Sequence, residues 1–123
     1  MSVLIVEDEF LIAEMLIDMI EDFGMKVCGH AVTAEETIKL AREHAPHIVM
    51  MDVCLKGKED GIYAAEEIAK FSPSTLVIFL TGSVDAETLE QIDSVKPVGV
   101  LHKPFRFAQL KTMLEKVSAC LAT

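Results

Sequence analysis

Charged or hydroxyl-bearing residues directly follow four of the short apolar segments of the chain. These residues are Glu7 and Asp8, Asp52, Thr81 and Lys103. An aspartate carboxylate is an established covalent acceptor of phosphoryl groups. An ammonium and a hydroxyl can neutralise the charge that the equatorial oxygens of a transferred phosphoryl group carry. The residue types therefore indicate phosphoryl transfer, provided that the fold brings them to one place.

Three of these residues are carboxylates, and their proximity would create a need for a cation. Glu7, Asp8 and Asp52 cannot all stay ionised within several ångströms of one another without a compensating charge. Mg²⁺ takes a few carboxylate ligands and keeps waters and phosphate oxygens in its remaining positions, so it is the expected ion. Taken singly, each residue has a plainer explanation as a solvated loop residue or a helix-dipole partner. The joint occurrence at four segment ends favours the site.

The segments that must position these residues alternate between two kinds of pattern. Short apolar runs predict strands over 2–6, 26–31, 47–51, 75–80 and 98–101. Amphipathic periodicity predicts helices over 10–23, 34–45, 62–71, 84–93 and 106–121. Strict alternation of five strands with five helices predicts an α/β fold with a doubly wound parallel sheet. Ligands bind such sheets at the carboxyl ends of the strands, and the second strand is expected to end without an equivalent group.

Local signals predict helix ends and buried faces. Thr33 and Glu36 form a capping box, with Glu36 reaching back, and Ser83 or Asp85 is the candidate cap of the fourth helix. The first helix is expected to bury Ile12, Met15, Leu16, Met19, Ile20 and Phe23. The last is expected to bury Phe107, Leu110, Leu114, Val117 and Leu121.

Length, charge and cysteine usage limit the classes of protein. The 123 residues predict a single domain, 1–123, with no effector domain. A net charge of −9 argues against a nucleic-acid partner and an anionic membrane surface. We expect neither a membrane span nor a signal peptide. Three cysteines without C-x-x-C spacing are expected to be buried, reduced residues of a cytoplasmic protein.

In this order and spacing, the motifs resemble the receiver domain of bacterial two-component response regulators. The likeness covers essentially the whole chain and rests on VLIVEDE at 3–9, Met51-Asp52, Asp60-Gly61, Thr81 and Lys103-Pro104-Phe105. It implies the flavodoxin-like receiver fold. It also implies that Asp52 accepts the phosphoryl group, with Thr81 and Lys103 contacting it. Mg²⁺ would be held by Glu7, Asp8, Asp52 and the backbone carbonyl of Cys54.

The resemblance further implies partners and a mode of action. The phosphoryl donor would be a phosphohistidine on a histidine kinase or a histidine phosphotransfer protein. The domain would catalyse only its own phosphorylation and dephosphorylation, so it is a signalling receiver rather than an enzyme. Phosphorylation would switch a surface that binds a downstream target protein or a second copy as a homodimer. Val100, Pro104 and Phe105 are the candidate switch and interface residues, and a cis peptide is expected before Pro104.

Departures from the family pattern keep some alternatives open. Lys56 replaces a frequent proline, Gly82 a frequent alanine, and Val100 an aromatic residue that usually swings inward. A haloacid-dehalogenase-type phosphatase is disfavoured because Cys54 stands where that family needs a second aspartate. A receiver-like binding module that works without phosphorylation stays open. Among phosphorylated roles, a relay, a phosphate sink and a direct effector are equally compatible with the sequence.

Overall fold

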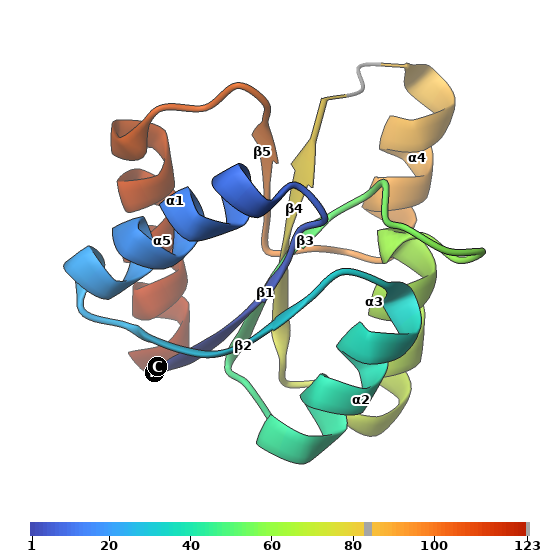
Figure 1. The fold of residues 1–123 in the computed structure, drawn as a ribbon, viewed down its shortest axis with the longest axis horizontal. Helices are drawn as coiled ribbons and strands as arrows, with labels where there is room; N and C mark the ends of the chain where they lie inside the picture. Colours follow the sequence, from blue (N-terminus) through green and yellow to red (C-terminus); the bar gives the residue numbers. More distant parts are fainter. Residues whose placement is uncertain (83–84, 123) are drawn as a thin grey trace.

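The computed structural model describes residues 1–82 and 85–122, and its core is one five-stranded parallel sheet (Figure 1). The strands are β1 (Ser2–Val6), β2 (Lys26–Ala31), β3 (Ile48–Asp52), β4 (Leu76–Thr81) and β5 (Gly99–His102). The helices are α1 (Phe10–Phe23), α2 (Ala34–His44), α3 (Gly61–Phe71), α4 (Ala86–Ser94) and α5 (Phe107–Ala122). This confirms the predicted α/β alternation, with element ends shifted by one or two residues.

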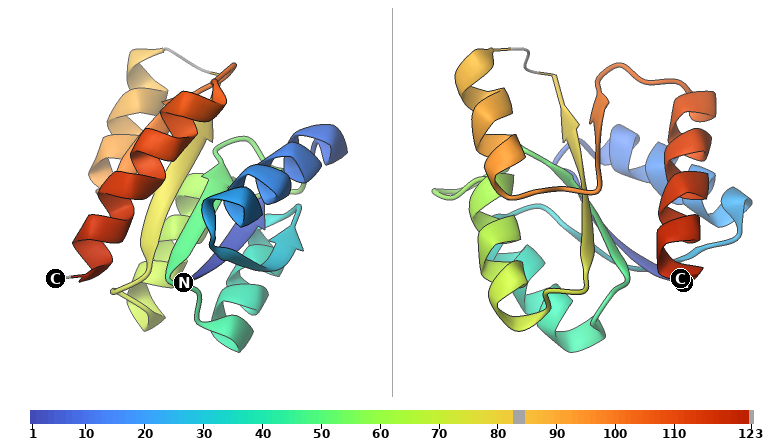
Figure 2. Two further views of the ribbon diagram at one scale, coloured as in Figure 1. Left: turned by 90° about the vertical axis from the view of Figure 1, so that its left-hand side faces the viewer. Right: turned by 180° about the vertical axis from the view of Figure 1, so that it is seen from behind.

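The strands lie in the order β2-β1-β3-β4-β5, and every neighbouring pair is parallel. Helices α1 and α5 cover one face of the sheet, and α2, α3 and α4 cover the other (Figures 1 and 2). Side chains of β1 alternate between the two cores: Val3 and Ile5 pack toward α1 and α5, whereas Leu4 and Val6 pack toward α2 and α3. The predicted doubly wound sheet, buried on both faces, is therefore confirmed.

The predicted helix starts are mostly correct, with one difference in the capping box. Thr33 Oγ1 accepts from the Glu36 N–H at 3.1 Å, as expected. The Glu36 carboxylate instead accepts from the N–H of Val32 at 2.8 Å, one residue before the cap. Asp85 caps α4 by accepting from the Thr88 N–H, and the alternative cap Ser83 lies outside the described residues.

Two large side chains were wrongly assigned to buried helix faces. Met15 is 40% exposed and Phe107 is 42% exposed. On α1 the stripe that packs against the sheet runs through Ala13, Leu16 and Ile20, which places Met15 at its margin. Phe107 is the first residue of α5, before the helix reaches the core at Leu110.

The cysteines also differ from expectation. Cys54 and Cys120 are exposed and Cys28 is half-buried, so the prediction that the cysteines are buried is wrong. None of the three forms a disulfide in the described part of the chain. Among the helices that the structure describes, none combines the length and apolar character required to cross a bilayer.

Candidate functional site

The carboxyl ends of the parallel strands bring the candidate residues to one edge of the sheet. This is the edge toward which the β4 and β5 arrows point in Figure 1. Asp52 ends β3 and Thr81 ends β4, while Glu7 and Lys103 directly follow β1 and β5. The side chains of Glu7, Asp52 and Thr81 are buried, which is unusual for polar groups and requires partners for them.

Lys103 is the cationic partner of two buried carboxylates. Its Nζ donates to Glu7 Oε1 at 2.6 Å and to Asp52 Oδ2 at 2.8 Å. Its backbone N–H donates to the carbonyl of Thr81 at 2.8 Å, which ties the end of β5 to the end of β4. Burial alone would lower the pKa of Lys103, but the hydrogen bonds and negative charges of Asp52 and Glu7 leave it raised, so the ammonium stays charged.

One lysine does not neutralise the acidic group. Glu7, Asp8 and Asp52 each offer a carboxylate oxygen, and these oxygens lie within 4.8 Å of one another. Burial first, and then the hydrogen bond and charge of Asp52, raise the pKa of Glu7 to about 8, although Lys103 opposes the shift. Glu7 Oε2 is buried without a hydrogen-bond partner among the described residues. An orphaned buried oxygen beside two further carboxylates fits the ligand preference of a hard divalent cation such as Mg²⁺.

The turn between β3 and α3 holds Asp52 from the other side. The backbone N–H of Cys54 donates to Asp52 Oδ1 at 3.0 Å, while the thiol of Cys54 is exposed. Gly61 N–H donates to the Val53 carbonyl at 2.8 Å, and a Cβ on Gly61 would lie 2.3 Å from the Asp52 carbonyl oxygen. Only glycine allows this close approach, which gives the Asp60-Gly61 motif a physical reason.

The three predicted switch residues surround the site without joining the acidic group. Pro104 is exposed and follows a cis peptide bond, as the resemblance implied, and Phe105 is half-buried. Both line a cavity of about 380 Å³ together with Ile12, Met15 and Lys103. Val100 is half-buried on β5 and lines a separate recess of about 500 Å³ with α4.

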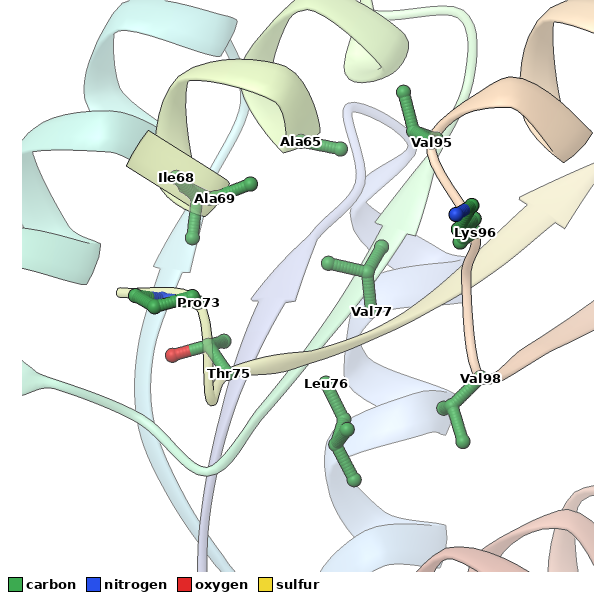
Figure 3. Close-up of a pocket in the computed structure, with 10 residues that line it drawn as sticks. All are labelled: Ala65, Ile68, Ala69, Pro73, Thr75, Leu76, Val77, Val95, Lys96 and Val98. Carbon is green, nitrogen blue, oxygen red and sulfur yellow. The ribbon is translucent and has the colours of Figure 1, made fainter. Parts of the chain in front are cut away.

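A cavity at the opposite end of the sheet has a different chemistry. It measures about 370 Å³ and lies between α3, the start of β4 and the segment that joins α4 to β5 (Figure 3). Its lining is mainly apolar, and its one charged residue is Lys96. Since no carboxylate lines it, this cavity lacks the groups for phosphoryl transfer.

The sequence analysis missed one residue at the carboxyl edge. His30 lies next to the end of β2, and its Nε2 is 2.8 Å from the carbonyl oxygen of Glu7. No polar residue follows β2, as expected, since Val32 comes after Ala31, but His30 supplies a polar group from within the strand. A histidine that hydrogen-bonds a backbone carbonyl has no sequence motif. Only the position of His30 next to the end of a predicted strand could have indicated its role.

Comparison with known proteins places this geometry among signalling domains. Residues 3–115 match the family model of the response regulator receiver domain. The transcriptional regulatory protein PdtaR of Mycobacterium tuberculosis is 35% identical over 92% of this chain, and the chemotaxis protein CheY of Thermotoga maritima is 30% identical over 94%. The match spans 54% of PdtaR and 96% of CheY.

The chain spans about half the length of several curated relatives, including PdtaR and the probable C4-dicarboxylate response regulator DctR of Bacillus subtilis. A crystal structure with the same fold is the signal receiver domain of a modulated diguanylate cyclase from Desulfovibrio desulfuricans. It is 34% identical, with a TM-score of 0.86, and the match covers 94% of this chain and 91% of that one.

Proposed function

The chain belongs to the family of response regulator receiver domains of two-component systems, and on this basis we propose that Asp52 is its phospho-acceptor. The phosphoryl donor is a phosphohistidine on a histidine kinase or a histidine phosphotransfer protein. Residues 1–123 act as one receiver unit. It promotes its own phosphorylation and dephosphorylation and turns over no other substrate.

The observation that carries this proposal is the placement of Lys103. Its Nζ contacts Glu7 and Asp52, which lie 96 and 51 residues away in the chain. A salt bridge between exposed side chains would contribute little to stability. Here both carboxylates are buried, one carboxylate oxygen has no partner among the described residues, and a third carboxylate lies beside them. Such an arrangement suits a group that carries several negative charges and arrives with a cation.

We propose that Mg²⁺ is held by Glu7, Asp8, Asp52 and the carbonyl of Cys54. When bound, it supplies positive charge to the oxygens of the phosphoryl group. A carboxylate oxygen of Asp52 forms the bond to phosphorus while the phosphorus–nitrogen bond of phosphohistidine breaks. The departing imidazole nitrogen keeps the electron pair of that bond. Metaphosphate-like character in the transition state makes charge neutralisation the main task of the surrounding residues.

Lys103 and Thr81 respond to the new phosphoryl group. The Lys103 ammonium, now shared between two carboxylates, pairs with a phosphoryl oxygen, and the Thr81 hydroxyl donates to another. Because the backbones of these two residues are hydrogen-bonded, their movements are coupled. Thr81 precedes α4, so this movement reaches the recess between α4 and Val100. We propose this face for the downstream target protein or a homodimer.

Exposed apolar side chains beside the site suit the docking of the phosphoryl donor. Phe10 and Leu11 begin α1 and are 67% and 78% exposed. Met15 and Pro104 line the neighbouring cavity, whose lining includes Lys103. A helical donor placed against this surface would bring its phosphohistidine to Asp52. Because such donors draw on cytoplasmic ATP, we also propose a cytoplasmic location.

The test is phosphorylation of the whole chain by acetyl phosphate in the presence and absence of Mg²⁺, followed by intact-mass measurement. We expect the mass of one phosphoryl group to be added only with Mg²⁺ and only when Asp52 is present. Asp52→Asn is the matched variant, since it keeps the size of the side chain. An adduct that survives in Asp52→Asn would refute the assignment. No adduct on the wild type would favour the module that binds without phosphorylation.

A further inference from the structure

We propose that His30 is a positioning residue, which holds the turn that carries Glu7 and Asp8 in the geometry that Mg²⁺ binding requires. Its imidazole fixes the backbone of Glu7 and contacts neither the cation nor the phosphoryl group. This inference rests on the proposed function, because it concerns the same acidic site.

A β-bulge in β2 aims His30 at the site. Val3 of β1 pairs with Val27, but Leu4 pairs with Gly29, so Cys28 is an extra residue in β2. The extra residue reverses the alternation of side chains beyond it. Ala31 consequently packs into the core on the α2 side, and its neighbour His30 points to the α1 side of the sheet.

Without this bulge, His30 would face the apolar core between the sheet and α2. Gly29 suits the bulge, since a Cβ there would lie 3.3 Å from the Leu4 side chain and press on it. Bulges are frequent beside active sites because they redirect one side chain. The local irregularity of β2 thus has a specific result, which is the contact between His30 and the first turn of the site.

His30 and its neighbour fix both peptide groups of Glu7. The carbonyl of Ala31 accepts from the Glu7 N–H at 3.1 Å, and His30 Nε2 lies 2.8 Å from the Glu7 carbonyl oxygen. A carbonyl oxygen can only accept, so Nε2 carries the proton and donates. Both backbone dihedral angles of Glu7 are restrained as a result, and with them the directions of the Glu7 side chain and of Asp8.

The turn needs this restraint because its own helix does not supply one. Helices α2, α3 and α4 begin with side-chain caps from Thr33, Asp60 and Asp85. Glu9, at the start of α1, makes no side-chain capping hydrogen bond in the described part of the chain. The turn from β1 into α1 is therefore held from β2, by His30, rather than from within.

The experiment compares Mg²⁺ affinity, measured by isothermal titration calorimetry on the whole chain, in wild type, His30→Leu and His30→Gln. Leucine removes the donor, whereas the amide nitrogen of glutamine reaches about as far as Nε2. Removing a residue that hydrogen-bonds a metal ligand typically lowers metal affinity by about 10–100-fold. His30 holds the backbone of Glu7 rather than its carboxylate, so we expect a smaller loss of Mg²⁺ affinity, about 5–10-fold, in His30→Leu. His30→Gln should bind within about twofold of wild type.

His47→Leu is the matched control. Its Nδ1 also meets a backbone group, the N–H of Ser2 at 3.1 Å, but at the other end of β1. Unchanged affinity in His30→Leu, or an equal loss in His47→Leu, would overturn the proposal. An equal loss in His30→Leu and His30→Gln would also overturn it, because the hydrogen bond would then not be the cause. If His30→Leu does not fold, His30→Phe replaces it with the same expected results.

A second measurement separates this inference from the proposed function. Amide hydrogen exchange in the metal-free protein reports whether the Glu7–Asp8 turn loosens. We expect the exchange rates of the Glu7 and Asp8 amides to rise about 5–10-fold in His30→Leu. In His30→Gln these rates should equal those of wild type. Failure of wild type to bind Mg²⁺ would count against the proposed metal site. Unchanged exchange rates in His30→Leu would overturn the role of His30 whether or not Mg²⁺ binds.

Discussion

The two ends of the parallel sheet bury opposite kinds of group. Glu7, Asp52 and Thr81 are buried at the carboxyl end, and Thr37 is the other buried polar residue in the described part of the chain. The amino end, by contrast, lines its cavity mainly with apolar side chains, and Lys96 is the one charged residue among them (Figure 3). Buried like charges reduce stability, so the carboxyl end keeps an arrangement that packing alone would not select.

The difference between the two ends indicates that residues at the carboxyl end lower the stability of the fold in favour of function. The core on both faces of the sheet satisfies ordinary packing, as the buried residues Val3 to Val6 of β1 illustrate. At the carboxyl end one ammonium contacts two of three clustered acidic side chains, and the excess of acidic groups favours a bound cation. If the two ends differ in this way, substitutions at the carboxyl end should change metal binding or phosphorylation, whereas substitutions at the amino end should change only stability.

Removing the ammonium of Lys103 should have the largest effect on stability. Lys103→Met leaves Glu7 and Asp52 buried without their ammonium. In EDTA, the free energy of unfolding should therefore fall by about 2 kcal/mol. The expected loss is smaller than for a fully buried pair because the Lys103 side chain is partly exposed. Saturating Mg²⁺ should restore part of this loss, since it replaces the missing positive charge. Urea denaturation with and without Mg²⁺ measures both. A loss that Mg²⁺ does not reduce would argue that no cation binds there.

The buried acid should make stability depend on pH. Because the pKa of Glu7 rises from 4.5 to about 8 on folding, the folded protein holds its proton more tightly than the unfolded chain. This contribution is complete below pH 4.5 and is lost as pH rises through 8. In EDTA, wild type should lose about 1–2 kcal/mol more than Glu7→Gln between pH 5 and pH 9.

Urea denaturation at several pH values gives this difference, and Glu14→Gln on the exposed side of α1 is the control. Mg²⁺ affinity of wild type should rise over the same pH range, because the ion competes with the proton on Glu7. Parallel pH profiles for wild type and Glu7→Gln would contradict the assignment of the shift to Glu7.

Removing the hydroxyl at the end of β4 should affect chemistry more than stability. Thr81→Val keeps the shape of the side chain but cannot donate to the phosphoryl group, so phosphorylation by acetyl phosphate should slow about tenfold. Mg²⁺ affinity should stay within about twofold of wild type, because Thr81 is not among the proposed ligands. Thr112→Val on α5 is the matched control. Equal rates for Thr81→Val and wild type would remove Thr81 from the proposed site.

Filling the opposite cavity should have the smallest effect and only on stability. Ala69→Leu extends an exposed α3 side chain over the apolar lining shown in Figure 3. The free energy of unfolding should rise by up to about 1 kcal/mol through added apolar burial. Phosphorylation rates should stay within about twofold of wild type. A larger change in rate would show that this end of the sheet communicates with the site, and the contrast between the two ends would fail.

Most of the fold follows from patterns that are local in the sequence. Apolar runs such as Val3–Val6 and the capping residues Thr33 and Asp85 indicate strands and helices directly. In a parallel sheet these elements also place the residues after each strand at one edge, so the grouping of Glu7, Asp52 and Lys103 was predictable. The error at Met15 arose because periodicity alone does not give the width of the buried stripe, and the error at Phe107 because it does not show where along a helix burial begins.

The rest depends on interactions between segments that periodicity does not encode. The bulge at Cys28 is visible only in the register of β2 against β1, and it decides which way His30 points. The Glu36 carboxylate accepts from the N–H of Val32, which lies between the end of β2 at Ala31 and the helix cap at Thr33. The exposure of Cys54 follows from the turn that wraps around Asp52. Each of these results needs the assembled sheet.

The 96-residue span between Glu7 and Lys103 has a consequence for biosynthesis. While the chain is still being translated, Glu7 and Asp52 leave the ribosome long before Lys103, whose ammonium contacts both of them in the folded protein. A nascent polypeptide that stops short of Lys103 holds these carboxylates without the ammonium that contacts Glu7 and Asp52 in the folded protein. The proposed phospho-acceptor pocket can therefore assemble only after Lys103 has emerged from the ribosome, and shorter nascent chains lack it.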